Sequence, residues 1–244
     1  MPVAAIVAAW TLALVAEVSG QANAVHHHEL VEGSLPLLAA LGLFLVAWQL
    51  HIAAMMLPSS LPLMVLFSRA ASTQPRPGAA KAAFVGGYAA VWSAFGAAAL
   101  IADAAVHEVA HVWPWLHDRE GLLLGILLLV AGAFQFTSLK NRCLTSCRNP
   151  AAYLMPRYRR GALAAFRLGR GHGLYCLGCC WALMLVMVAV GIANLAWMAP
   201  LTAVMIIEKV TPAGHRWVRP IGVALLGLGA LILVQPSWLP PGMA

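Results

Sequence analysis

Long apolar runs recur along the whole chain and constrain its fold more than any other feature. Apolar residues make up 62% of the 244 positions and charged residues only 9%, whereas a soluble domain carries about half and about a quarter. A run of roughly twenty apolar residues crosses about 30 Å of hydrocarbon as a helix. Because a helix satisfies its own backbone hydrogen bonds there, the sequence predicts an all-α, polytopic bundle of transmembrane helices.

We expect about seven membrane helices, two of them short, in a single integral membrane domain over residues 1–244. Their predicted ranges are 2–18, 35–57, 82–102, 121–139, 174–193, 195–207 and 220–234. The first run is followed by a small-residue pattern typical of signal-peptide cleavage, but no basic segment precedes it, so we expect a retained helix. Pro58 and Pro62 end or kink the second run, because proline lacks the amide that a helix needs.

The charges segregate along the chain in a way that predicts its orientation. With the N-terminus inside, fourteen of the fifteen Lys and Arg residues fall on the inner side, eight of them in a connector over residues 140–173. Seven of the eight acidic residues fall on the outer side. The positive-inside rule then places the N-terminus and the basic connector in the cytoplasm, as in a multi-pass protein of the cell inner membrane.

The net charge of +7 does not indicate nucleic-acid binding. Its distribution is explained by topology and by contact with lipid headgroups, so the predicted partner of the basic segments is the bilayer. No glycine-rich turn between a strand and a helix offers a phosphate or dinucleotide site.

All five cysteines flank the basic connector. Two follow the fourth run and three begin the fifth: Cys143, Cys147, Cys176, Cys179 and Cys180. Cytoplasmic thiols stay reduced, and residues four apart on a helix share one face, which Met184 continues. Because thiolate and thioether sulfur suit Cu(I), zinc or iron–sulfur clusters, we predict a metal site here. The alternative is that these sulfur side chains only fill the core.

Several segments resemble a known family. The stretch 173–184, GLYCLGCCWALM, is followed by Asn194, Trp197-Met198 and Glu208-Lys209. Together they resemble the DUF2182 family of predicted metal-binding integral membrane proteins. The resemblance extends to segments 138–147, 54–62 and 87–92, so it covers most of residues 45–210. It implies a membrane metal-binding role, with no established reaction.

Histidines gather on the predicted outer side. His26 and His28 follow the first run, and His107 and His111 lie beyond the third. If the third helix continues, Asp103, His107 and His111 share one face and present imidazole ligands to a metal. The alternative is that these histidines are solvated loop residues.

The segment from His107 to His111 also fits the zinc-protease pattern H-E-x-x-H, in which Glu108 would be the general base. Pro114 stands near the place where the longer pattern turns at a glycine, and its fixed φ cannot make a left-handed turn. The loop also leaves no room for a substrate-binding sheet. The sequence therefore favours proteolysis less than metal binding.

His51 lies inside the second run, with Met55 one turn later on the same face. A histidine in hydrocarbon is costly and usually faces the bundle interior, where it pairs with a polar group or binds a ligand. We predict that this pair is a soft site between the outer imidazoles and the inner thiols. A histidine hydrogen-bonded to a backbone carbonyl is the alternative.

Histidine, methionine and cysteine together match both oxidation states of copper, so copper is favoured, with zinc or iron as alternatives. We predict an integral membrane metal-binding protein that handles copper by binding it, transferring it or delivering it to a protein partner. The alternative is a non-catalytic membrane anchor or assembly subunit of a larger complex. An enzyme is less favoured, either the metalloprotease above or a thiol oxidoreductase that uses Cys176 and Cys179.

Overall fold

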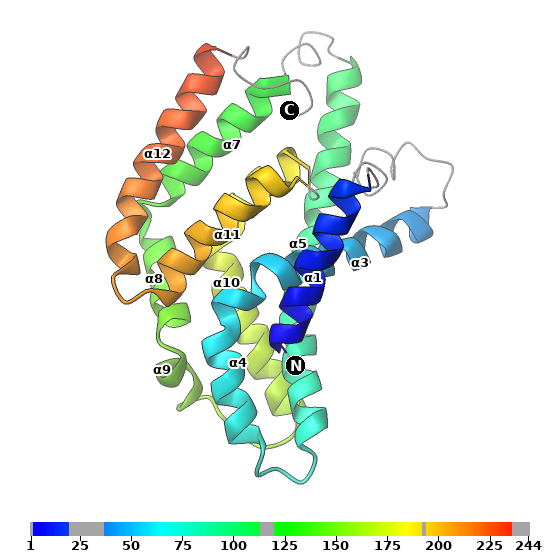
Figure 1. The fold of residues 1–244 in the computed structure, drawn as a ribbon, viewed down its shortest axis with the longest axis vertical. Helices are drawn as coiled ribbons and strands as arrows, with labels where there is room; N and C mark the ends of the chain where they lie inside the picture. The colour runs from blue at the N-terminus through cyan, green and yellow to red at the C-terminus, as the bar shows by residue number, and fades with distance from the viewer. Residues whose placement is uncertain (1, 20–36, 113–119, 192–193, 236–244) are drawn as a thin grey trace.

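The computed structural model describes residues 2–19, 37–112, 120–191 and 194–235, and within these ranges the chain is helical and contains no strand (Figure 1). This confirms the predicted all-α class. The helices in chain order are α1 (Pro2–Val18), α3 (Leu37–Met55), α4 (Leu57–Ala71), α5 (Pro77–Val112), α7 (Glu120–Phe134), α8 (Ser138–Arg148), α9 (Pro150–Leu154), α10 (Ala162–Ala189), α11 (Leu195–Val210) and α12 (Gly214–Val234).

Three of the described helices are long and apolar enough to cross a membrane, namely α5, α10 and α12. The number rises to five if each of two bent pairs, α3 with α4 and α7 with α8, is a single span. Helix α1 is apolar but shorter. Length and composition are thus compatible with a multi-pass membrane protein, while the number seven and the side of the N-terminus stay predictions.

The predicted break after the second apolar run is confirmed, because α3 and α4 meet at an angle of 78°. In an unbroken helix the Ala54 carbonyl would accept a hydrogen bond from residue 58, but Pro58 has no N–H. The indole of Trp10 in α1 donates to that carbonyl instead, at 3.1 Å. Ser59 Oγ donates to the Met56 carbonyl at 3.0 Å. The break is therefore satisfied by protein groups, as an apolar surrounding requires.

Helices α5 and α10 pack with their backbones in close approach. A Cβ atom on Gly87 would collide with the backbone of Phe166, and one on Gly169 would collide with the backbone of Phe84. Small residues at such positions let two helices meet at short distance. Gly96 of α5 faces the buried indole of Trp48, whereas Gly86 faces open space.

The start of α10 corrects the predicted start of the fifth membrane helix. We expected residues 140–173 to form a connector and the helix to begin at Leu174, whereas α10 begins at Ala162. The Arg and Gly residues of this segment predicted a connector, not the first turns of a membrane helix. However, Ala165, Leu168 and Gly169 are buried on one face of α10, and this face packs on α5. The earlier part of the connector contains α8 and α9.

Replacing Gly87 with alanine tests the close approach of α5 and α10. We expect Gly87→Ala to lower the free energy of unfolding by about 1–3 kcal/mol or more, because a backbone cannot move aside as a side chain can. Gly86→Ala, one residue earlier with nothing within 4 Å, should be neutral or stabilising by up to about 1 kcal/mol. Thermal unfolding in detergent measures both, and equal melting temperatures would contradict the packing.

Candidate functional site

Sulfur atoms from three parts of the fold gather around the middle of α10. We call Met56, Cys147, Cys176, Cys179 and Cys180 the sulfur cluster. Cys176, Cys179 and Cys180 lie on α10 and are at most 1% exposed, and Met56, at the joint of α3 and α4, is fully buried. Cys147 comes from α8 and is half-buried. The sequence places the three α10 thiols within one helical turn, while only the fold adds the other two sulfurs.

The ammonium group of Lys209, near the end of α11, lies among these sulfur atoms. Its Nζ is 3.2 Å from Cys176 Sγ, 3.7 Å from Cys180 Sγ and 3.9 Å from Met56 Sδ. Ser59 Oγ, at 3.4 Å, is its one oxygen partner among the described residues. A buried ammonium needs an anionic partner to offset its lost hydration. Among the described residues, the Cys176 sulfur is the thiol nearest to Nζ and can supply that charge.

The hydrogen bonds of the three α10 thiols assign them different roles. Cys179 Sγ and Cys180 Sγ donate to the carbonyl oxygen of Cys176, at 3.1 and 2.8 Å. Cys176 Sγ instead receives Lys209 and lies 3.2 Å from the Tyr88 hydroxyl. Two polar groups converge on the Cys176 sulfur, so it is the thiol best placed to be the anion beside Lys209.

A chain of polar side chains continues from Cys176 toward α4. The Tyr88 hydroxyl lies 3.4 Å from Ser60 Oγ, which lies 3.3 Å from His172 Nε2. His172 is buried and stacks on the Tyr88 ring, with 5.6 Å between ring centroids. His172 lies within the basic connector predicted over residues 140–173, and its burial shows that this part of the connector faces the protein interior. Tyr88 lies in segment 87–92, which resembles the DUF2182 family, but the resemblance gave this residue no role.

The sulfur cluster contains two pairs whose spacing suits a shared soft metal. Cys147 Sγ lies 3.9 Å from Cys179 Sγ, and Cys180 Sγ lies 3.7 Å from Met56 Sδ. Two sulfur ligands at a metal–sulfur distance of about 2.3 Å lie at most about 4.6 Å apart, so both spacings fit. In the described part of the chain, no three His, Cys, Asp or Glu side chains group around one metal position. The sulfur is thus presented in pairs.

Two other predicted sulfur ligands lie outside these pairs. Cys143, one turn before Cys147 on α8, is buried with its Sγ against the backbone of α10, where a Cβ on Gly178 would lie 2.6 Å away. Met184 is fully buried on α10 and belongs to the apolar core. Neither sulfur belongs to one of the two pairs found among the described residues. Both side chains pack in the interior, and their role as metal ligands stays a prediction.

His51 and Met55 are both buried on α3, as expected for a polar group and its neighbour facing the interior. The His51 ring stacks on Trp48 of the same helix, with centroids 5.8 Å apart. Met55 is fully buried in the apolar core. Their joint role as a soft site stays a prediction.

The predicted outer ligands fall largely outside the described residues. His26 and His28 lie in the segment 20–36, which the structure does not describe, and the same holds for the side chains of His107 and His111. Helix α5 does extend to Val112, so the expected continuation of the third helix past Asp103 is present. The outer metal site and the protease pattern stay predictions.

One ion pair and a set of hydrogen bonds from Arg148 hold α8 against α11. These helices carry Cys147 and Lys209. Lys140 Nζ donates to Glu208 Oε2 at 2.6 Å, and both side chains are almost completely buried. Arg148 donates from its guanidinium to the carbonyl oxygens of Glu208, Thr211 and Pro212, at and just beyond the end of α11. Unpaired carbonyls at a helix C-terminus attract cations. The positions of the two helix ends are thereby coupled.

These features define a class of protein, all-α with helices of membrane-spanning length and a buried, sulfur-rich polar site. The family model described as PpoB2, copper chaperone, matches residues 45–232. The match covers most of the chain, so the protein belongs to this copper chaperone family. The description of this family names copper, whereas the resemblance to DUF2182 implies only a metal. The name DUF2182 is not part of that description. Curated proteins and solved structures gave no match.

The buried pair Lys140 and Glu208 offers a test of this architecture. Replacing either partner alone, as Lys140→Met or Glu208→Met, should lower the free energy of unfolding by about 3–5 kcal/mol, because the remaining group stays buried without its partner. The double variant should lose less than either single variant. Unfolding measurements on all four proteins form a double-mutant cycle. Simple addition of the two single effects would show that the groups are not coupled.

Proposed function

We propose that the protein binds Cu(I) at the sulfur cluster within the bilayer and passes it to a protein partner. The observation that carries the proposal is the pairing of Cys147 with Cys179 and of Met56 with Cys180 beside α10, in a member of a copper chaperone family. Thiolate and thioether are the ligands that select Cu(I). Paired sulfurs suit it further, since this d¹⁰ ion accepts two-coordinate geometry whereas structural zinc sites use four ligands.

The ammonium of Lys209 and a Cu(I) ion compete for the same sulfur atoms. In the described structure its ammonium places one positive charge beside Cys176 and Cys180. A Cu(I) ion carries the same charge and seeks the same sulfur atoms. Copper entry therefore displaces the ammonium from the sulfurs, and the flexible four-carbon stem of lysine allows this movement. Ser59 Oγ, already 3.4 Å from Nζ, is the partner that the displaced ammonium keeps.

The gradient of exposure gives the site a direction. Cys176, Cys179 and Cys180 are enclosed, whereas Cys147 on α8 is half-buried. Thiol exchange requires an accessible sulfur. Copper held between Cys147 and Cys179 is therefore the copper that an incoming thiolate of an acceptor reaches. Because α8 carries Lys140, Arg142 and Arg148, the positive-inside rule puts this exit on the cytoplasmic side of the inner membrane.

The binding part of the proposal is tested by removing thiols. Cys179→Ala combined with Cys180→Ala removes one sulfur from each pair and should lower Cu(I) affinity at least about 100-fold, since loss of even an outer partner of a metal ligand costs 10- to 100-fold. Cys143→Ala is the matched control, because that thiol is buried nearby but lies outside both sulfur pairs. Anaerobic Cu(I) titration against a chromogenic chelator measures all three proteins. Unchanged affinity in the double variant would favour the anchor or assembly subunit instead.

The transfer part is tested at Cys147. We expect Cys147→Ser to slow copper release to a soluble dithiol acceptor, because the accessible sulfur of the Cys147 and Cys179 pair is lost. Cys143→Ser, one turn away on the same helix, should release copper at the wild-type rate. Stopped-flow transfer from copper-loaded protein provides the measurement. Equal rates for the two variants would exclude Cys147 as the exit.

A further inference from the structure

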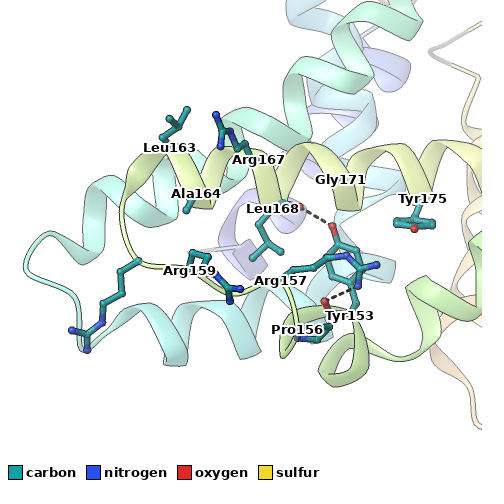
Figure 2. Close-up of a pocket in the computed structure, with 11 residues that line it drawn as sticks. Tyr153, Pro156, Arg157, Arg159, Leu163, Ala164, Arg167, Leu168, Gly171 and Tyr175 are labelled. Atoms are coloured by element: carbon teal, nitrogen blue, oxygen red, sulfur yellow. Dashed lines mark hydrogen bonds between the residues drawn. The ribbon is translucent and has the colours of Figure 1, made fainter.

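A basic cavity lies apart from the sulfur cluster, at the beginning of α10. It has a volume of about 600 Å³ and lies between α10 and the segment that follows α9, within the usual size of ligand pockets. Figure 2 shows Arg157 and Arg159 in this space beside Leu168, while Leu163 and Arg167 project from α10. Arg160 also lines the cavity.

The four guanidinium groups of this cavity have no carboxylate partner among the described residues. The ion pair found among these residues joins Lys140 on α8 to Glu208 on α11, away from the cavity. Arg157 and Arg159 donate only to the backbone carbonyls of Tyr153 and Tyr158, at 3.2 and 2.9 Å. Like charges held in one pocket repel one another. The arrangement therefore favours an anion supplied from outside the chain.

The segment that carries these arginines is held in place before any ligand arrives. The Tyr158 hydroxyl donates to the Ala70 carbonyl at 2.8 Å and accepts from Gln74 at 2.9 Å. Gln74 Oε1 in turn accepts from the Gly161 amide at 3.0 Å. Both contacts tie the segment to the end of α4. Preorganisation of this kind lowers the entropic cost of binding.

Tyr153 positions one of the arginines that line the cavity, Arg157. The Arg157 guanidinium lies 4.7 Å from the centroid of the Tyr153 ring, a cation–π contact. The Tyr153 hydroxyl donates to the Leu168 carbonyl at 2.9 Å. Burial raises the pKa of Tyr153 to about 12, so the phenol stays neutral and keeps this hydrogen bond at physiological pH. Arg157 is thus fixed at the wall of the cavity.

The surroundings of the cavity distinguish a lipid from a free anion. Leu163, which lines the cavity, is 64% exposed, and Met155 and Leu174, each next in sequence to a lining residue, are 77% and 55% exposed. A free phosphate offers nothing to cover them, whereas the acyl chains of a lipid do. Guanidinium groups bind phosphate oxygens in a bidentate manner. The first turn of α10 adds unpaired backbone amides that favour an anion.

We propose that this cavity binds the phosphate headgroup of an anionic phospholipid, with the acyl chains lying along Met155, Leu163 and Leu174. The inference rests on the membrane placement given under the proposed function, but not on copper binding. It assigns a specific lipid site to a segment whose arginines otherwise indicate only a cytoplasmic orientation.

The test compares lipid binding to the full-length protein in neutral detergent by native mass spectrometry. The probes are phosphatidylglycerol, phosphatidylcholine with the same acyl chains, and inorganic phosphate. We expect wild-type protein to retain phosphatidylglycerol at concentrations where phosphatidylcholine is lost and phosphate does not compete. Equal retention of the two lipids would overturn the proposal. Competition by phosphate at the lipid concentration would assign the cavity to a free anion and overturn the lipid.

A pair of double variants locates the site. Arg159→Gln with Arg167→Gln should weaken phosphatidylglycerol binding about thirtyfold, at about 1 kcal/mol for each arginine. Arg157 is kept because it packs on Tyr153. The matched control is Arg216→Gln with Arg219→Gln, two exposed arginines on α12 outside the cavity, which should change binding less than about threefold. Equal losses would indicate diffuse surface charge and overturn the pocket.

Cu(I) titration of the same proteins keeps the two proposals separate. The Arg159 and Arg167 double variant should bind copper as wild type does, because neither residue contacts the sulfur cluster. Lipid selectivity without copper binding would refute the proposed function and leave this inference standing, whereas copper binding without lipid selectivity would do the reverse.

Discussion

The buried ammonium of Lys209 is the constraint on which the architecture of the site depends. A cation enclosed by protein is tolerated only where nearby groups offset its lost hydration. Here these groups are the sulfur atoms of Cys176, Cys180 and Met56 and one serine hydroxyl. Since they come from α10 and from the joint of α3 and α4, the end of α11 must be held against both. The Lys140–Glu208 pair and the Arg148 contacts hold it there.

The break between α3 and α4 serves the same site. Proline at position 58 removes one helical hydrogen bond, and the chain turns by 78°. The turn places Met56 at the joint and brings Ser59 and Ser60 inward at the beginning of α4. A continuous helix would have carried these residues away from α10 along one axis. The helix break therefore brings the Met56 thioether to Cys180, the Ser59 hydroxyl to Lys209 and the Ser60 hydroxyl to Tyr88 and His172.

The sequence predicted the helical class, the proline break and the shared face of Cys176 and Cys180, because each depends on local periodicity or on the chemistry of one residue type. It did not predict the partners of the thiols. Lys209 was identified only as an inner-side charge and as part of a resembling segment, and His172 only as a residue of the basic connector. Their burial arises from the packing of α10 against α5 and α11, which joins residues that are distant in sequence. The start of α10 was missed for a related reason. Glycine and arginine are typical of a connector, but here Gly169 packs on the backbone of Phe84.

Copper handling and structural integrity place opposing demands on the sulfur cluster. A storage site would favour several fixed ligands around one metal position, whereas a chaperone must bind its ion and release it. Sulfur presented in pairs, with an ammonium held among the enclosed thiols, satisfies the second demand. Under the proposed function, Cu(I) binding to a pair of thiols releases their protons, so the thiolates formed offset the charge of the ion.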